Sequence, residues 1–598
     1  MTNIFRIHGD NIVECERLLN IIISQVKPYQ YSAFLVSPST ICIDIEFSYA
    51  GNNYSWIIEL LPGFNKAGRN RWEGNIFDPL RENGSFLDET PDAIVTKIDD
   101  SWETILYALE FCSALQAGNQ AWQRSGRAFS TGRTGCPYLY IVDFVKYELD
   151  SSTRVRKALR FPNAAVPYSY INFSRNSNNF VAQVYVRSEE FDKTADYQLH
   201  DFDENDFADK EMAAYMVKKM CGLDTSTEEA EIMRKNLNVV LFLSKRFNSN
   251  RNFSGTQWRR LYTYHQGIIR FSIENSTFNF HKIITEKGHH GKSPQVLNLI
   301  DEYSIGLAAR DLPFGIIPAN QRPMFAEQLQ NIYPSFSSQI IDKIGNTDKD
   351  LILCLLKGFK PKGDDNRPDR GLLPFATMLS SHDSEIMAYI YGPVFYSNYQ
   401  LLLNNPRALA RSNGLWKSIL ALSNYVVLDV PILRAHINHA ETLLDTSALK
   451  QEYTAIPQNT NGLKRIAFSS IPQNYHEDDV DTGIHYLFAH ILNNICFEGM
   501  CNPPGGDWSG FSILDGNSEK RWLSLPRVSN DIDGKRPDHI IELFGVFEKP
   551  LLISIESKEK SIDLEPDVGS RLINYLKRLM DFIPNVERII RPGIGSWR

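Results

Sequence analysis

The sequence predicts a multidomain protein with an α/β domain at each end and a mainly helical region between them. Its 598 residues exceed what one hydrophobic core usually organises, and its 43% hydrophobic and 22% charged residues are typical of a globular chain. Strand and helix patterns alternate near both ends, whereas apolar residues recur at helical spacing in the middle. We therefore expect an N-terminal α/β domain over residues 1–200, a mainly helical middle region over 201–460 and a C-terminal domain over 461–598.

The composition excludes several classes of protein. There is no run of about 18 apolar residues, so we expect no membrane-spanning helix and no membrane partner, and the first residues contain no apolar signal-peptide core. The eight cysteines are scattered without a C-x-x-C pair or zinc-ligand spacing, which is typical of a cytoplasmic protein with reduced thiols. Because the net charge is −8, any binding to nucleic acid would depend on local basic segments.

The N-terminal pattern reads as helix, three strands, helix and strand. Apolar residues at helical spacing over Asn11–Val26 predict the first helix, which should stop at Lys27-Pro28. The elements expected after it are strands at Ala33–Phe47, Tyr54–Leu61 and Pro91–Ile98, a long helix at Trp102–Gln123, and a strand at Pro137–Glu148.

The middle region is expected to bury its helices through short apolar runs, of which the clearest are Asp350–Leu356, Ser384–Tyr391 and Leu415–Val427.

The C-terminal domain reads as helix, strands and helix. The expected elements are a helix at Asp481–Phe497, strands at Trp508–Leu514, Arg521–Val528, Pro537–Phe544 and Leu551–Lys558, and an amphipathic helix at Asp567–Phe582. Only residues 585–598 follow the last helix. Either Val586–Ile590 forms one more strand, or that strand is missing from the chain.

Two neighbouring strands of this domain carry polar groups at one end. Asp538 opens one strand, and Glu556 and Lys558 end the next, 18 positions later for Glu556, which is hairpin distance. Side chains alternate along a strand, so Glu556 and Lys558 should share a face about 6.5–7 Å apart. Two carboxylates can hold Mg²⁺ through oxygen ligands, and a lysine beside them can orient a water molecule and stabilise developing negative charge. These residue types in this pattern favour metal-dependent hydrolysis of phosphodiesters.

Pro537-Asp538 followed by Glu556-Ser557-Lys558 resembles the motif of the PD-(D/E)xK nuclease superfamily, and the helix, mixed sheet and helix order resembles its core. Within that superfamily the chain looks most like a large type II restriction endonuclease, to which Ile7–Arg17 and Gln123–Arg127 are also similar.

The resemblance implies that Asp538 and Glu556 are ligands of Mg²⁺ and that Lys558 is the catalytic lysine. The family often adds another acid, for which Glu498 and Asp507 are the candidates. The implied function is a Mg²⁺-dependent endonuclease that cleaves double-stranded DNA at a specific sequence in a bacterial restriction system. A homodimer and a companion DNA methyltransferase are then plausible partners.

Other interpretations stay open. A nuclease of the same superfamily in DNA repair or phage defence would cleave without strict sequence recognition. A catalytically silent protein would bind DNA only. An aspartate at a strand start can also be a turn cap, and Glu556 with Lys558 can be the solvated edge of a sheet.

DNA binding would use two basic segments. Residues 234–270 contain eight lysines and arginines and no acid, and residues 124–160 contain eight against three acids. Arginines beside asparagine and glutamine suit contacts to phosphates and base edges. The predicted DNA contacts are Arg251, Gln257, Arg259, Arg260, Arg124 and Arg127.

The N-terminal domain also carries acids at Glu46, Glu59 and Asp92. Pro91-Asp92 opens a predicted strand as Pro537-Asp538 does, but no E-x-K follows. A degenerate nuclease-like or DNA-binding domain and an unrelated α/β domain are therefore both open, and a second active site is the least favoured alternative.

Overall fold

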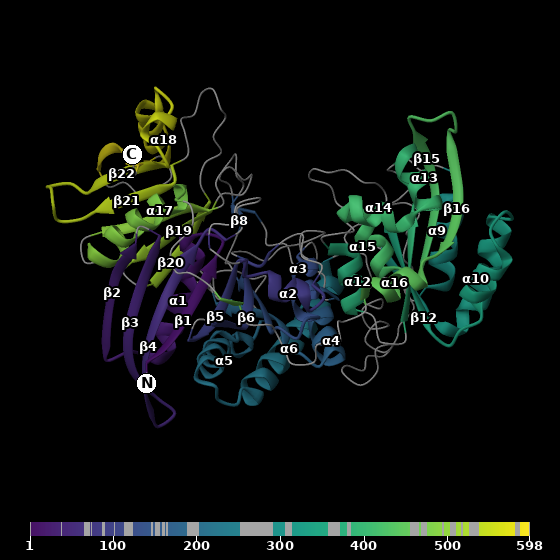
Figure 1. Cartoon of the computed structure of the whole chain (residues 1–598), viewed down its shortest axis with the longest axis horizontal. Helices are drawn as coiled ribbons and strands as arrows, with labels where there is room; N and C mark the ends of the chain where they lie inside the picture. Colours follow the sequence, from purple (N-terminus) through teal and green to yellow (C-terminus); the bar gives the residue numbers. More distant parts are fainter. Residues whose placement is uncertain are drawn as a thin grey trace.

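The structure is a computed structural model, and it shows a mixed α/β chain with several sheets (Figure 1). Within residues 496–524 only the backbone is described. The described residues run from 2 to 596 without 38, 65–71, 73–74, 86–89, 101, 113–123, 145–147, 150–155, 158–161, 163–164, 188–201, 251–290, 305–313, 357–370, 380–383, 455–465, 468–474, 493–495, 503–509, 516–517, 525–536 and 581–586.

The N-terminal sheet has the strand order β10-β7-β6-β5-β1-β4-β3-β2. Its strands are β1 (Asn3–Gly9), β2 (Gln30–Ser37), β3 (Thr40–Tyr49), β4 (Asn52–Pro62), β5 (Ala93–Asp99), β6 (Trp102–Cys112), β7 (Tyr138–Phe144) and β10 (Val181–Arg187). The predicted strand at Ala33–Phe47 is therefore two antiparallel strands, because the chain turns between Ser37 and Thr40.

Helices cover both faces of this sheet. The core on one face joins apolar side chains of the strands to α1 (Ile12–Val26) and α5 (Asp209–Cys221). The core on the other face joins them to α3 (Ser125–Gly132), α4 (Ala165–Ser177) and α6 (Ser226–Asn250). The predicted first helix is confirmed: Asn11 caps it by accepting a hydrogen bond from the backbone N–H of Glu14.

The helix predicted at Trp102–Gln123 is wrong over the part that the structure describes. Residues 102–112 form β6, which pairs antiparallel with β5 and parallel with β7. Leucine, alanine and glutamate favour a helix on propensity alone, but this strand lies inside the sheet, and pairing on both sides overrides that preference.

The middle region is α/β. It contains helices, as predicted, but also a sheet that the sequence pattern did not predict. Its sheet has the order β11-β12-β13-β15-β14, with β16 paired to β15. The strands are β11 (Phe314–Ile317), β12 (Asp350–Leu356), β13 (Ser384–Ile390), β14 (Val394–Phe395), β15 (Tyr425–Leu433) and β16 (His439–Asp445). The helices include α9 (Ser293–Tyr303), α10 (Arg322–Ile332), α11 (Ser338–Gly345), α12 (Leu373–Leu379), α13 (Tyr396–Asn404), α14 (Pro406–Ser412), α15 (Gly414–Leu422) and α16 (Ser447–Thr454).

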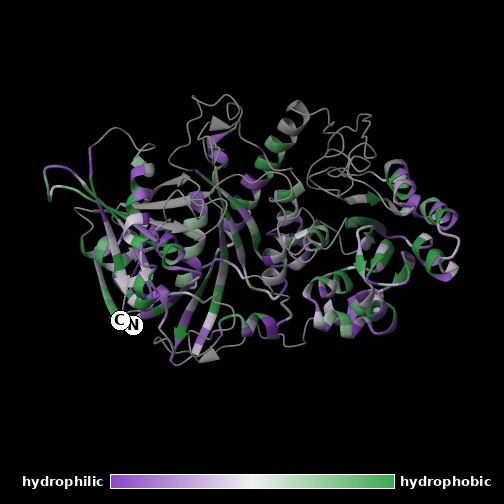
Figure 2. Cartoon of the chain, turned by 90° about the horizontal axis from the view of Figure 1, so that it is seen from above, coloured by the Kyte–Doolittle hydropathy of each residue, from purple (hydrophilic) through white to green (hydrophobic). Residues whose placement is uncertain are grey.

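The error in the middle region has a physical cause. The apolar runs in β12 and β13 are central parallel strands, buried on both faces, so they lack the alternation of polar and apolar residues that marks a half-exposed strand. Helices such as α10 and α11 keep one face in solvent, and the helices of this region carry both hydrophobic and hydrophilic residues in Figure 2.

The C-terminal sheet has the order β20-β19-β18-β21-β22-β23. Its elements are α17 (Glu477–His485), a π-helical turn (Tyr486–Ile491), β18 (Cys496–Asn502), β19 (Gly510–Asp515), β20 (Ser518–Ser524), β21 (His539–Leu543), β22 (Leu551–Lys558), α18 (Val568–Met580) and β23 (Ile589–Ser596). The helix predicted at Asp481–Phe497 begins earlier, at Glu477, and its last two predicted residues belong instead to β18. The strand after the last helix is present as β23, parallel to β22.

Two parts of the chain share one strand arrangement. In the order β18-β21-β22-β23, the successive pairings are antiparallel, antiparallel and parallel, with α18 between the last two strands in sequence. The order β1-β5-β6-β7 has the same three pairings, with α3 in the corresponding place. The N-terminal sheet therefore repeats the central strand pairing of the C-terminal sheet.

The C-terminal domain lies beside the N-terminal sheet (Figure 1). The Tyr486 hydroxyl donates a hydrogen bond to the carbonyl of Ala33 on β2, 3.3 Å away. Among the described helices, none is both long and apolar enough to span a bilayer.

Candidate active site

Asp538 and Glu556 lie beside each other at the ends of β21 and β22. The backbone N–H of Asp538 donates to the carbonyl of Ile555 at 2.9 Å, and the backbone N–H of Ser557 donates to Oδ2 of Asp538 at 2.8 Å. The antiparallel register pairs His539 with Ile555, which brings Asp538 opposite Glu556. Residues opposite each other on paired strands share a face of the sheet. The structure thus brings together the two acids predicted from the sequence.

Lys558 completes the group. Its Nζ lies 2.9 Å from Oε1 of Glu556 and 2.8 Å from Oε1 of Glu477 on α17. Glu556 is buried, with 2% of its surface exposed. Burial opposes the lysine's charge, but hydrogen bonds to Glu477 and Glu556 outweigh it and raise the pKa of Lys558 above its ordinary value. The lysine is therefore a cation held beside two carboxylates.

Negative charge gathers around Asp538. Burial, together with the charges of Asp481 and Glu556, raises the pKa of Asp538 to about 8. Asp481 lies on α17, where its Oδ1 is 2.9 Å from Nε2 of His539. Burial and the neighbouring carboxylates both disfavour an unpaired negative charge on Asp538, so a bound cation would stabilise it, and carboxylate oxygens are the ligands that Mg²⁺ prefers. Asp538 and Glu556 fit the predicted role of metal ligands, with Asp481 beside them.

Two acids of the candidate active site, Glu477 and Asp481, were not predicted from the sequence. They are four residues apart on α17, so they lie on one face of the helix. The cluster of acids from Glu477 to Asp481, just before an apolar helical pattern, was the available signal. The helix packs tightly on β23, because a Cβ at Gly595 would lie 2.5 Å from Ile484 and 2.9 Å from Val480.

Glu498 and Asp507, the candidates for a further acid of the site, stay predictions. Glu498 lies in β18, where its backbone pairs with Ile541 of β21, and its side chain is outside the described atoms. Asp507 lies outside the described residues.

The predicted DNA contacts fall into two groups. Arg251, Gln257, Arg259 and Arg260 lie outside the described residues and stay a prediction. Arg124 and Arg127 are described, and both form ion pairs with the buried carboxylate of Glu110. These pairs compensate part of their charge, so less of it is left for phosphate groups.

The N-terminal sheet contains a counterpart of the candidate site. Asp92 precedes Glu110 by 18 positions, the same interval as from Asp538 to Glu556. The backbone N–H of Phe111 donates to Oδ2 of Asp92 at 2.8 Å, which matches the hydrogen bond from Ser557 to Asp538. Two differences separate the sites. Cys112 stands where the motif would have lysine, and the guanidinium of Arg127 lies against both Glu110 and Asp92.

The counterpart is therefore poorly suited to hold a metal. An arginine already supplies the positive charge that a cation would bring to Asp92 and Glu110. Among the other N-terminal acids, Glu59 accepts a 2.7 Å hydrogen bond from Nε of Arg6. Of the two similar sites, only the one at Asp538 combines acids with a lysine.

Replacing Arg127 tests this interpretation of the N-terminal pair. Arg127→Met keeps the side-chain volume but leaves Glu110 with less compensation, and Glu110 is fully buried. We expect a loss of about 3 kcal/mol in stability, measured as a lower melting temperature in scanning fluorimetry. Arg81→Met is the matched control, because Arg81 forms an exposed pair with Asp78, and it should cost less than about 1 kcal/mol. Equal effects of the two changes would contradict the structural role of Arg127.

Comparisons with known proteins found no family model, no curated protein and no solved structure that matches this chain.

Proposed function

We propose that the chain is a Mg²⁺-dependent endonuclease that hydrolyses phosphodiester bonds in double-stranded DNA at a specific sequence, as restriction enzymes do. The observation that carries the proposal is the convergence of Asp538, Glu556 and Lys558 on two paired strands, with Asp481 adding negative charge. Buried ionised groups are paired or coordinate a metal, and a metal would compensate the negative charge of Asp538 and Glu556 that Lys558 leaves.

The proposed mechanism assigns a role to each side chain. Asp538 and Glu556 would hold the metal, which when bound supplies Lewis-acid polarisation of the phosphate and a more acidic water. Lys558 would orient the attacking water and stabilise the charge that develops on the phosphate oxygens. Glu477 would hold the ammonium of Lys558 in place through its 2.8 Å contact.

Sequence recognition is the finer part of the proposal. It rests on the two basic segments, of which residues 234–270 contain no acid. Cutting both strands of a duplex needs two catalytic events, so one such site per chain favours a homodimer on DNA. A companion methyltransferase would protect the host's own target sites.

Neutralising two arginines tests the DNA-binding part. Arg259→Gln with Arg260→Gln should weaken binding and reduce the slope of log K against log salt by about 1.8, because each phosphate contact contributes about 0.9. Fluorescence anisotropy at several salt concentrations measures the slope, and Ca²⁺ in place of Mg²⁺ avoids cleavage. An unchanged slope would place the DNA elsewhere on the protein.

Digestion of an unmethylated plasmid tests the activity. We expect discrete fragments with Mg²⁺ and intact plasmid with EDTA. A smear would favour a nuclease without strict recognition and would contradict the proposed sequence specificity. DNA binding with no cleavage under any metal condition would favour a catalytically silent protein and overturn the proposal.

A further inference from the structure

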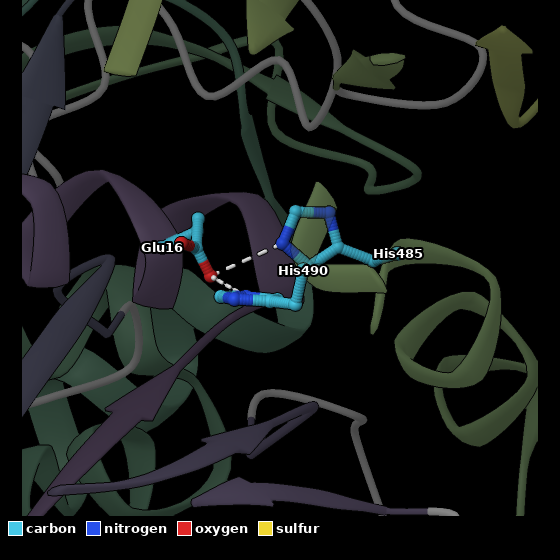
Figure 3. A group of neighbouring side chains, drawn as sticks. All are labelled: Glu16, His485 and His490. Atoms are coloured by element: carbon cyan, nitrogen blue, oxygen red, sulfur yellow. Dashed lines mark hydrogen bonds and ion pairs between the residues drawn. The ribbon is translucent and has the colours of Figure 1, made fainter. Parts of the chain in front are cut away.

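A carboxylate and two imidazoles from distant parts of the chain meet in the protein interior. Glu16 lies on α1, His485 ends α17, and His490 lies in the π-helical turn that follows. Oε2 of Glu16 is 3.1 Å from Nε2 of His485 and 3.2 Å from Nε2 of His490 (Figure 3). None of the three side chains is more than 1% exposed.

The π-helical turn brings His485 and His490 to the same side of the helix. In an α-helix, residues five apart point about 140° away from each other, because each turn takes 3.6 residues. A π-helix closes its hydrogen bonds between residues five apart, which brings such residues toward one side. His485 and His490 therefore point toward the same carboxylate, as Figure 3 shows. Such π turns are frequent at functional sites.

An ion pair alone leaves part of this group unexplained. Oε1 of Glu16 is buried, and it has no hydrogen-bond partner in the structure. Asn20 follows one turn later on α1, on the same face, and both polar atoms of its side chain are also buried without a hydrogen-bond partner. Buried polar atoms normally find a partner, and leaving one unsatisfied costs about 1–3 kcal/mol. Each of these atoms can form one more bond, to a water molecule or to a bound ion.

The donor set and its spacing suit zinc. Two imidazole nitrogens and one carboxylate oxygen are common zinc ligands, with bonds of about 2.0–2.2 Å. Tetrahedral geometry then separates the ligand atoms by about 3.3 Å, close to the 3.1 and 3.2 Å that separate Glu16 from the histidines. The other nitrogen of His490, Nδ1, is 3.2 Å from the Tyr31 hydroxyl, a contact that orients the ring as partners of metal-bound histidines do.

We propose that Glu16, His485 and His490 form a structural zinc site that fastens the C-terminal domain to the N-terminal domain. Asn20 or a water molecule would occupy the fourth position. The site lies at the C-terminal end of α17, whereas Glu477 is its first residue and Asp481 lies in its middle. Zinc binding would therefore fix the helix that carries two acids of the candidate active site. The proposal does not depend on nuclease activity, because zinc content is measured without DNA.

The test is zinc binding by the full chain. The variant Asp538→Asn with Glu556→Gln removes the acids of the other candidate metal site, and this protein is stripped with a chelator. Titration against a chromophoric zinc chelator, followed by elemental analysis, should give one zinc per chain. Adding Glu16→Gln removes a direct ligand and should weaken binding by at least about 100-fold, the upper end of what loss of an outer-shell partner costs.

The matched control is Glu441→Gln. Glu441 belongs to a second group with a similar composition, Asp429, His439 and Glu441, but it already pairs with Nζ of Lys292 at 2.8 Å. Zinc affinity should be unchanged in this control. No zinc in the parent protein, or equal affinity with and without Glu16→Gln, would overturn the proposal.

X-ray absorption spectroscopy of the zinc-loaded parent protein identifies the zinc ligands directly, without any substitution at Glu16. Two imidazoles, oxygen ligands and no sulfur are expected. Sulfur ligands would place the zinc at cysteines and contradict the assignment.

Discussion

Glu556→Gln is expected to slow Mg²⁺-dependent DNA cleavage by about three to four orders of magnitude while leaving the fold intact. The amide has nearly the shape of the carboxylate but no negative charge, so it would hold a divalent cation poorly. Metal polarisation contributes several kcal/mol to transition-state stabilisation, and each 1.36 kcal/mol is a factor of ten in rate. We therefore expect a loss of roughly 10³- to 10⁴-fold. Single-turnover cleavage of a plasmid measures it.

DNA affinity is the control for this variant. Binding measured in Ca²⁺ should change little beyond the contribution of the metal itself, and the melting temperature should not fall. A variant that cleaves within about tenfold of the wild type would remove Glu556 from the catalytic site, since tenfold is only 1.36 kcal/mol.

Lys558→Ala is expected to have the second-largest effect. Its ammonium lies between Glu556 and Glu477, where it is placed to stabilise charge on a bound phosphate. Removing one such preorganised group usually costs about 10²- to 10³-fold in rate.

Lys558→Arg separates charge from position. The guanidinium keeps the positive charge but is planar and larger than an ammonium, so it should restore ion pairing with Glu556 and Glu477 but little of the rate. Full recovery of the rate with arginine would show that charge alone suffices and would contradict a water-orienting role. Glu477→Gln should lower the rate less than Lys558→Ala, because Glu556 still holds the lysine.

The candidate site was predictable because it depends on local pattern. Alternation along Leu551–Lys558 fixes the face of Glu556 and Lys558, and the hairpin interval fixes the pairing with Asp538. The acids of α17 were not predicted, since Glu477 reaches Lys558 across 81 positions and no local pattern encodes that contact.

The fold was predicted less well where strands are buried on both sides. The apolar runs in β12 and β13 were assigned to helices, and Trp102–Cys112 was assigned to a helix although it forms β6. In both places the strand pairs on both sides, and at least one partner, β7 for β6 and β11 and β13 for β12, lies about 30 to 40 residues away in the sequence. These pairings override local preference. The similarity of Asp92 and Glu110 to Asp538 and Glu556 was not predicted, because Glu110 lies in the segment that was assigned to a helix.

The two similar sites offer the most direct test of the central claim. Asp538 and Asp92 each accept a 2.8 Å hydrogen bond from a backbone N–H, and asparagine can accept the same bond through its oxygen. Asp538→Asn and Asp92→Asn are therefore matched changes, and Mg²⁺-dependent plasmid cleavage by both is the measurement. We expect Asp538→Asn to lose cleavage and Asp92→Asn to retain it. Cleavage that survives Asp538→Asn, or that is lost only with Asp92→Asn, would contradict the assignment of the active site to the C-terminal sheet.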